Sequence, residues 1–316
     1  MLFFVVCGSL EEIVLKAKPV DDSSRPAYAP RCLHEVLKVI HAERPSVVFA
    51  PHVETSSGII LPDWYIMAVA EAVHQVGGIF VLDCIASGCI WVNMNALGVD
   101  VLISAPQKGW SGSPCVGIVM LSKRARSLID STQSTCFAVD LRKWVEVMET
   151  YEKGGHMYHA TMPTDSIRRF WDVIKETEDY GIERAKQEQL ELGSAVRRML
   201  ALHGFKSVAA DAFAAPGVIV SYTEDPDLKS GAKLATHGLQ ISAGVPLMLD
   251  EFTQSASYRS FRFLVSLKLF CLLLLLLSLL FVVVVVVVGF VVVCCCCCCC
   301  CCYCCCLFIF YFYFTP

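Results

Sequence analysis

Residues 79–83 read IFVLD, and this stretch decides the fold, because four apolar residues in succession end in a carboxylate. A short continuous apolar run between turn residues is typical of a strand that is buried on both faces of a sheet. Just before it, Gly77 and Gly78 end a helix that Pro62 opens, whose apolar residues recur at helical spacing. We therefore predict a helix, a turn and a buried strand in succession, with Asp83 at the carboxyl end of the strand.

Similar apolar runs lie on both sides of this stretch. Upstream, a helix predicted over 31–43 is followed by SVVFA at 46–50; downstream, DVLISA at 100–105 and a run at 116–121 predict two more strands. Continuous apolar strands that alternate with helices indicate an α/β fold with a largely parallel sheet. Ligands bind at the carboxyl ends of such strands. Asp83 and Lys108, which both follow strands, are therefore candidate site residues.

The second half of the chain predicts a smaller α+β unit. A charged helical stretch over 165–202 precedes a strand at 217–223, a helix at 227–237 and a strand at 239–243. We predict a large domain over 1–180, a small domain over 181–262 and a separate tail over 263–316. The glycine patterns GxGxxG and GxxxxGKS/T are absent, so a dinucleotide or P-loop fold has no support.

Charge and cysteine usage narrow the class of protein. Residues 1–262 hold 25 of the 26 Lys and Arg and all 30 Asp and Glu, a net charge of −5, which argues against a nucleic-acid binder. Of the 19 cysteines, 13 lie in the tail, and the other six form no CxxC pair. We therefore expect no metal site and a reduced intracellular compartment.

The tail allows two interpretations. Residues 269–293 are almost wholly apolar, and as a helix of about 37 Å they would cross a hydrocarbon core of about 30 Å. They therefore read as a possible transmembrane segment. However, Leu272–Leu277, Val282–Val288 and Cys294–Cys302 are successive homopolymers. Leu, Val and Cys codons are the three reading frames of one GTT repeat, which favours translated repetitive DNA. We expect membrane association only if the tail is genuine.

Asp83 and Lys108 also allow two interpretations. Two strand-end residues of opposite charge are often only a solvated acid and an unrelated lysine, and taken alone this pair favours that explanation. Alternatively, a lysine can bind pyridoxal phosphate covalently while an acid holds the proton on the pyridine nitrogen of this cofactor. The surrounding sequence decides between them.

Three segments carry a family resemblance: FAPHVETSSGIILP at 49–62, IFVLDCIASGC at 79–89 and ISAPQKGWSGSPCVGIVML at 103–121. In this order they resemble the class V aminotransferases, which have fold type I of the pyridoxal phosphate (PLP)-dependent enzymes. The branch with the nearest resemblance is alanine–glyoxylate and serine–pyruvate aminotransferase. The resemblance runs from about residue 9 to residue 262 and implies an incomplete large domain and an incomplete small domain.

The resemblance makes Lys108 the catalytic Schiff-base lysine and Asp83 the partner of the pyridine nitrogen. Gln107 would lie beside the cofactor, and Thr55 would bond the ring oxygen or its surroundings. His52 is interpreted as structural.

Three more site residues follow from the resemblance. Tyr158 and Thr161, in MYHATMP, match a pair that reaches the cofactor phosphate from the partner subunit. Arg262, in SFRF, matches the arginine that binds the substrate carboxylate, a task suited to a bidentate guanidinium.

The function implied is amino transfer between alanine or serine and a 2-oxo acid, glyoxylate or pyruvate, by a homodimer. The family implies a cytoplasmic, peroxisomal or mitochondrial location. Family members carry roughly a hundred further N-terminal residues with a phosphate-binding loop, well within ordinary domain sizes. The alternatives are an inactive fragment and a membrane-anchored aminotransferase-like protein from a misassembled gene.

Overall fold

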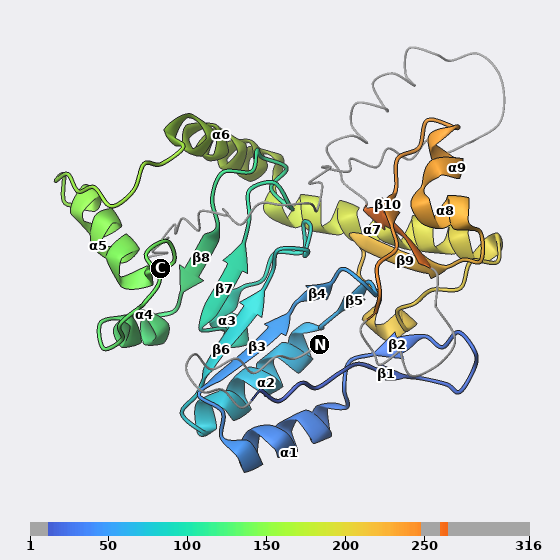
Figure 1. The fold of residues 1–316 in the computed structure, drawn as a ribbon, viewed down its shortest axis with the longest axis horizontal. Helices are drawn as coiled ribbons and strands as arrows, with labels where there is room; N and C mark the ends of the chain where they lie inside the picture. The colour runs from blue at the N-terminus through green and yellow to red at the C-terminus, as the bar shows by residue number, and fades with distance from the viewer. Residues whose placement is uncertain (1–11, 248–259, 265–316) are drawn as a thin grey trace.

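The computed structural model describes residues 12–247 and 260–264. Its main sheet has the order β3-β6-β7-β8 and consists of β3 (Val47–Pro51), β6 (Ile79–Asp83), β7 (Val101–Ser104) and β8 (Ile118–Leu121) (Figure 1). β3, β6 and β7 are parallel, as the apolar runs predict, whereas β8 runs antiparallel to β7. The fold is α/β with a mixed sheet.

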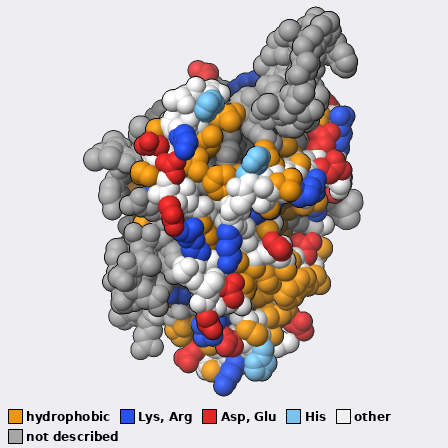
Figure 2. Space-filling model, turned by 90° about the vertical axis from the view of Figure 1, so that its right-hand side faces the viewer, with side chains coloured by type: hydrophobic (Ala, Val, Ile, Leu, Met, Phe, Trp, Pro, Cys, Tyr) orange, Lys and Arg blue, Asp and Glu red, His pale blue; other side chains and the backbone are white. Residues whose placement is uncertain are grey.

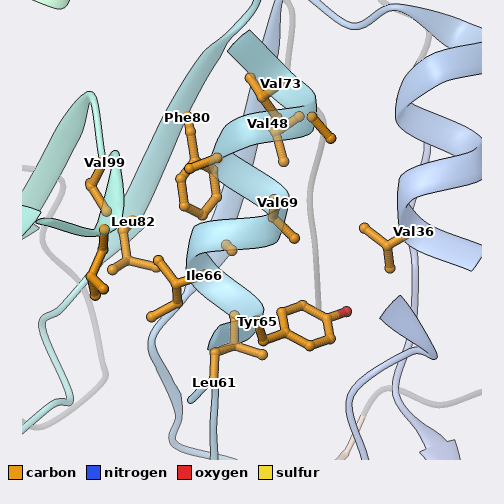
Figure 3. Packing of buried hydrophobic residues seen from close by; sticks show 14 of the residues in the cluster. Val36, Val48, Leu61, Tyr65, Ile66, Val69, Val73, Phe80, Leu82 and Val99 are labelled. Atoms are coloured by element: carbon orange, nitrogen blue, oxygen red, sulfur yellow. The ribbon is translucent and has the colours of Figure 1, made fainter. Parts of the chain in front are cut away.

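Helices α1 (Leu33–Glu43) and α2 (Asp63–Gln75) form the layer against this sheet. Figure 3 shows Leu82 beside Ile66, with Phe80 against α2. Phe80 and Leu82 alternate with half-buried residues along β6, because successive strand residues point to opposite faces. Removing each such side chain from water stabilises the fold by about 1.5–3 kcal/mol.

Three more helices, α3 (Met94–Leu97), α4 (Lys123–Ile129) and α5 (Leu141–Glu152), lie between β6 and the second half of the chain. They were not among the predicted elements. Ser122 precedes α4, and its side-chain oxygen accepts from the Ala125 backbone N–H and so caps the helix.

The second sheet is antiparallel and has the order β10-β11-β9. It consists of β9 (Val218–Tyr222), β10 (Ser242–Ala243) and β11 (Ser260–Leu264), with α8 (Pro226–Ser230) and α9 (Ala232–Ala235) in the connection after β9. α7 (Ile182–Leu202) packs Val196 and Leu200 against Ile219 of β9.

Short strands tie the beginning of the chain to the second sheet. They are β1 (Lys18–Pro19), β2 (Tyr28–Ala29), β4 (Val53–Glu54) and β5 (Ile59–Ile60), and a 3₁₀ turn, η1, spans Asp211–Phe213. Tyr28, Val53 and Ile59 share one buried cluster with Val218 and Val220 of β9.

Two long helices expected from the sequence are each interrupted by glycine. The stretch 165–202 forms α6 (Thr164–Tyr180) and α7, because Gly181 has φ 101°. The stretch 227–237 is broken between α8 and α9 at Gly231, with φ 84°. These are left-handed conformations that glycine adopts without strain. Gly181 coincides with the predicted domain boundary, and the division into domains stays a prediction.

Two predictions concern the C-terminal part of the chain. The strand expected over 239–243 is limited to Ser242–Ala243. The transmembrane segment predicted at 269–293 lies outside the described residues. Within residues 12–247 and 260–264, none of the helices has both the length and the apolar character to cross a membrane. On the face shown in Figure 2, basic and acidic side chains are interspersed around an apolar area rather than gathered by sign.

The core makes a direct prediction about stability. Phe80 is fully buried, so Phe80→Ala should lower the free energy of unfolding by about 4 kcal/mol, from lost transfer energy and the cavity left behind. Urea unfolding at neutral pH measures it. Met67→Ala, on the outward face of α2 where the side chain is 49% exposed, is the control and should cost less than about 1 kcal/mol. Equal losses for both variants would contradict this packing.

Candidate active site

The carboxyl ends of the parallel strands bring the predicted site residues to one edge of the main sheet. Pro51 at the end of β3 pairs with Asp83, which in turn pairs with Ile103 of β7. Gln107 and Lys108 follow β7 directly, and Thr55 opens the turn between β4 and β5, just beyond β3. Residues separated by more than fifty positions in sequence therefore share this edge.

Asp83 is a half-buried carboxylate in a low-polarity setting. Burial raises the pKa of its carboxyl and the nearby Glu54 charge raises it further, while the Ile85 backbone N–H and the Lys108 charge lower it. The Ile85 N–H donates to Oδ1 over 2.9 Å. Among the described residues, Asp83 has no cation within 4.0 Å. A positive charge placed against a carboxylate whose pKa is raised by burial stabilises its ionised form.

The loop after β7 presents Lys108 to solvent. The Lys108 N–H donates to the Ala105 carbonyl over 3.2 Å, and the Ser111 N–H donates to the Lys108 carbonyl over 2.9 Å. Beside it, the Oε1 atom of Gln107 is buried and has no hydrogen-bond partner in the described structure. Such a group costs free energy unless something binds it.

Trp110 anchors the same loop in the core. Its Nε1 atom donates to the Ser104 hydroxyl over 3.4 Å. Its ring packs edge-to-face on Trp91 at 5.6 Å and on Phe170 at 5.9 Å between ring centroids. Aromatic pairs of this geometry contribute about 0.5–1.5 kcal/mol beyond their buried area, so the loop has a rigid base two residues after Lys108.

His52 joins the loops after β3 and β6, in agreement with its interpretation as structural. Its Nδ1 atom lies 2.7 Å from the Ser87 hydroxyl, and its backbone N–H donates to the Asp83 carbonyl over 2.8 Å. The side chain is 1% exposed. Burial, and to a lesser extent the Lys186 charge, lower the pKa of His52 to about 4. The imidazole is therefore neutral at neutral pH.

A pocket of about 190 Å³ lies beside Thr55. Arg31 and Glu54 contribute charged side chains to its wall, and the segment 245–247 contributes apolar ones. Sequence reasoning missed this pocket, because its walls come from segments some two hundred residues apart that carry no shared motif. Thr55 is the one predicted site residue in its lining.

The structure joins Tyr158 and Thr161 to each other. The Tyr158 hydroxyl lies 3.1 Å from Thr161 Oγ1, and Tyr158 is 69% exposed. Within the described part of the chain, no hydrogen bond connects either residue to Asp83, Gln107 or Lys108. The structure therefore joins these two predicted residues to each other and not, by hydrogen bonds, to the other three.

Arg262 lies in β11, where its backbone pairs with Val220 and Ser242. It is thus in the middle strand of the second sheet. Over residues 12–247 and 260–264, no cluster of three or more His, Cys, Asp or Glu side chains could hold a metal ion.

Solved structures show which class of protein has this architecture. An alanine–glyoxylate aminotransferase from Nostoc sp. superimposes with a TM-score of 0.61 at 18% identity, covering 73% of this chain and 59% of that one. A pyridoxamine–pyruvate aminotransferase from Mesorhizobium loti gives 0.62 at 20% identity, with 73% and 57% covered. The fold is fold type I of the pyridoxal phosphate-dependent transferases.

Curated relatives make the comparison more specific. Alanine–glyoxylate aminotransferase 1 of Saccharomyces cerevisiae is 27% identical over 209 residues, 63% of this chain and 53% of the relative. A 2-aminoethylphosphonate–pyruvate transaminase of Bacillus cereus is 29% identical over 205 residues, with 63% and 53% covered. No family model matches. The chain spans about half the length of these relatives. The resemblance to the class V aminotransferases is confirmed.

The neutral His52 makes a prediction about pH. A histidine with a folded pKa of about 4 and an unfolded pKa of about 6.5 binds fewer protons folded than unfolded between these values. Stability is therefore full above pH 6.5 and falls as the pH drops toward 4, by about 2 kcal/mol between pH 7 and pH 5.

Denaturant unfolding of the parent chain and of His52→Asn at pH 7 and pH 5 measures this slope. The asparagine can keep a hydrogen bond to Ser87 but cannot gain a proton, so the variant should lose about 2 kcal/mol less than the parent on acidification. His41→Asn, on the exposed side of α1, is the control and should keep the parent's slope. If His52→Asn keeps it too, His52 is not buried in its neutral form.

Proposed function

We propose that this chain carries out pyridoxal phosphate-dependent amino transfer between a small amino acid and a 2-oxo acid. One observation carries the proposal. The half-buried carboxylate of Asp83, whose pKa is raised, lies at the same sheet edge as the exposed amine of Lys108 and the unpartnered oxygen of Gln107. This combination of side chains does not stabilise the sheet, so we attribute it to binding.

These residues fit the cofactor chemically. A carboxylate with a raised pKa suits a protonated pyridine nitrogen, which would supply the missing positive charge. An exposed primary amine can bond covalently to an aldehyde, and the hydroxyl of Thr55 and the amide of Gln107 offer hydrogen bonds to a ring oxygen. Bound pyridoxal phosphate supplies an electron sink for a carbanion at the substrate Cα.

The chain's own residues would then move the proton. Lys108 Nζ would take the proton from the substrate Cα as general base and would deliver it, as general acid, to the cofactor carbon that carried the aldehyde. Asp83 keeps a proton at the pyridine nitrogen throughout, which stabilises the negative charge that develops. The guanidinium of Arg262 suits a bidentate grip on the substrate carboxylate.

The printed names of the relatives guide the choice of substrates. Alanine and glyoxylate are named for one relative, and 2-aminoethylphosphonate and pyruvate for the other. We propose alanine or serine as donor and glyoxylate or pyruvate as acceptor for this chain, with 2-aminoethylphosphonate as a second donor to test. We further propose a homodimer, since the exposed Tyr158–Thr161 pair suits a phosphate held from a neighbouring subunit.

Covalent capture of the cofactor tests the proposal without requiring turnover. The full chain is incubated with pyridoxal phosphate, reduced with borohydride and mapped by mass spectrometry. We expect modification at Lys108 and its loss, by more than about 10-fold, in Lys108→Ala. Lys123→Ala, in the first turn of α4, is the control and should be captured like the parent. Undiminished single-site capture by Lys108→Ala would refute the assignment.

Asp83 provides a second test, based on stability. Because burial raises its folded pKa, the ionised carboxylate destabilises the folded chain above the unfolded pKa of about 3.8, so this cost is present at pH 7. Asp83→Asn should therefore melt at a higher temperature than the parent without cofactor. With saturating pyridoxal phosphate the order should reverse, since the parent binds the protonated ring more tightly.

Thermal unfolding of both proteins with and without the cofactor measures this crossover. Asp130→Asn, an exposed residue at the end of α4, is the matched control and should not change the order. An Asp83→Asn protein that gains as much from pyridoxal phosphate as the parent would argue against contact with the pyridine nitrogen.

A further inference from the structure

The loop after β6 meets the Lys108 loop through bare backbone. A Cβ atom built on Gly109 would lie 2.0 Å from the Gly88 carbonyl oxygen and 2.7 Å from its carbon. Any side chain at position 109 is excluded by these distances. Gly109, the residue after Lys108, therefore rests directly on Gly88, five residues after Asp83.

The side chain of Gln189 lies next to Gly88. A Cβ atom on Gly88 would be 3.5 Å from Gln189 Oε1. Gln189 is 1% exposed, although α7 is otherwise strongly charged. Its Nε2 atom donates to the Pro216 carbonyl over 3.3 Å, and Pro216 precedes β9 by two residues. One buried amide thus lies beside the loop of Asp83 and is hydrogen-bonded just before the second sheet.

We propose that Gln189 is a positioning residue that sets the place of Lys108 relative to Asp83 through the contacts Gln189–Gly88–Gly109. The inference rests on the proposed function insofar as Lys108 captures pyridoxal phosphate. Gln189 touches neither residue, and it acts by fixing the backbone between them.

The physical basis is the absence of side-chain freedom at these contacts. A rotamer change absorbs a small displacement between two side chains, but two glycine backbones in contact must move together. The hydrogen bond to Pro216 fixes the amide of Gln189 against the second sheet. A shift of α7 therefore reaches Gly88, then Gly109 and Lys108, and small misplacements near reacting groups can slow a reaction by about 100-fold.

Two substitutions separate contact from hydrogen bonding. Gln189→Met keeps the length of the side chain against Gly88 but loses the hydrogen bond, whereas Gln189→Ala loses both. Gln187→Ala, exposed on the same helix, is the matched control. The readouts are the rate of pyridoxal phosphate capture at Lys108 and the ¹⁹F resonances of a 5-fluorotryptophan-labelled chain, in which Trp110 reports on the Lys108 loop.

We expect Gln189→Ala to shift the Trp110 resonance, to leave that of Trp144 in α5 unchanged, and to slow capture by roughly 10-fold. Gln189→Met should slow capture less, and Gln187→Ala should match the parent. An unshifted Trp110 resonance in Gln189→Ala, or equal shifts at Trp110 and Trp144, would overturn the inference. If the parent captures no cofactor at Lys108, the proposed function fails, and the Trp110 resonance alone decides whether Gln189 sets the position of the loop.

Discussion

Hydrogen bonding of β6 on both of its edges is the constraint on which the candidate site depends. β6 pairs in parallel with β3 on one side and with β7 on the other, so the backbone of Asp83 cannot shift without breaking two ladders. The same parallel pairing delivers the loops after all three strands to one edge. Each loop is then fastened to a neighbour: His52 holds Ser87, and Gly109 rests on Gly88. The main sheet therefore brings the candidate site residues to one edge, and the contacts between the loops fix their positions there.

The opposite end of β6 is fastened by a different device. The Asp100 carboxylate is 2% exposed and accepts from the Phe80 backbone N–H over 2.9 Å, while lying 2.8 Å from His74 Nε2 and 3.2 Å from the Ser122 hydroxyl. It thereby joins α2, β6 and the start of α4. A buried carboxylate with its oxygens so fully engaged is a structural feature. Asp83, with one backbone donor and a raised pKa, contrasts with it at the other end of the strand.

The sequence was sufficient to predict the strands that depend on local patterns of apolar residues, and the site residues that lie in a recognisable motif. Apolar runs predicted β3, β6 and β7, and the positions of Asp83 and Lys108 followed from their ends. The direction of β8 could not be predicted, because a short apolar run carries no sign of orientation. Gln189 lies next to Gly88 although about a hundred residues separate them in sequence, so spacing does not reveal their proximity. The helix breaks at Gly181 and Gly231 could not be predicted from these glycines alone, because a glycine within a helical pattern does not always end a helix.

Residues that lower the stability of the folded chain are the strongest physical argument for a functional site in this fold. The packed core needs neither an unpartnered amide oxygen at Gln107 nor a half-buried carboxylate at Asp83, and each of them costs folding free energy. Natural proteins keep such costs mainly where a site requires them. Here they lie beside an exposed lysine, on a loop that Trp110 anchors and glycine contacts fix. A ligand that brings a positive charge to Asp83 and a donor to Gln107 would relieve both costs at once, and the proposed function relies on these same features.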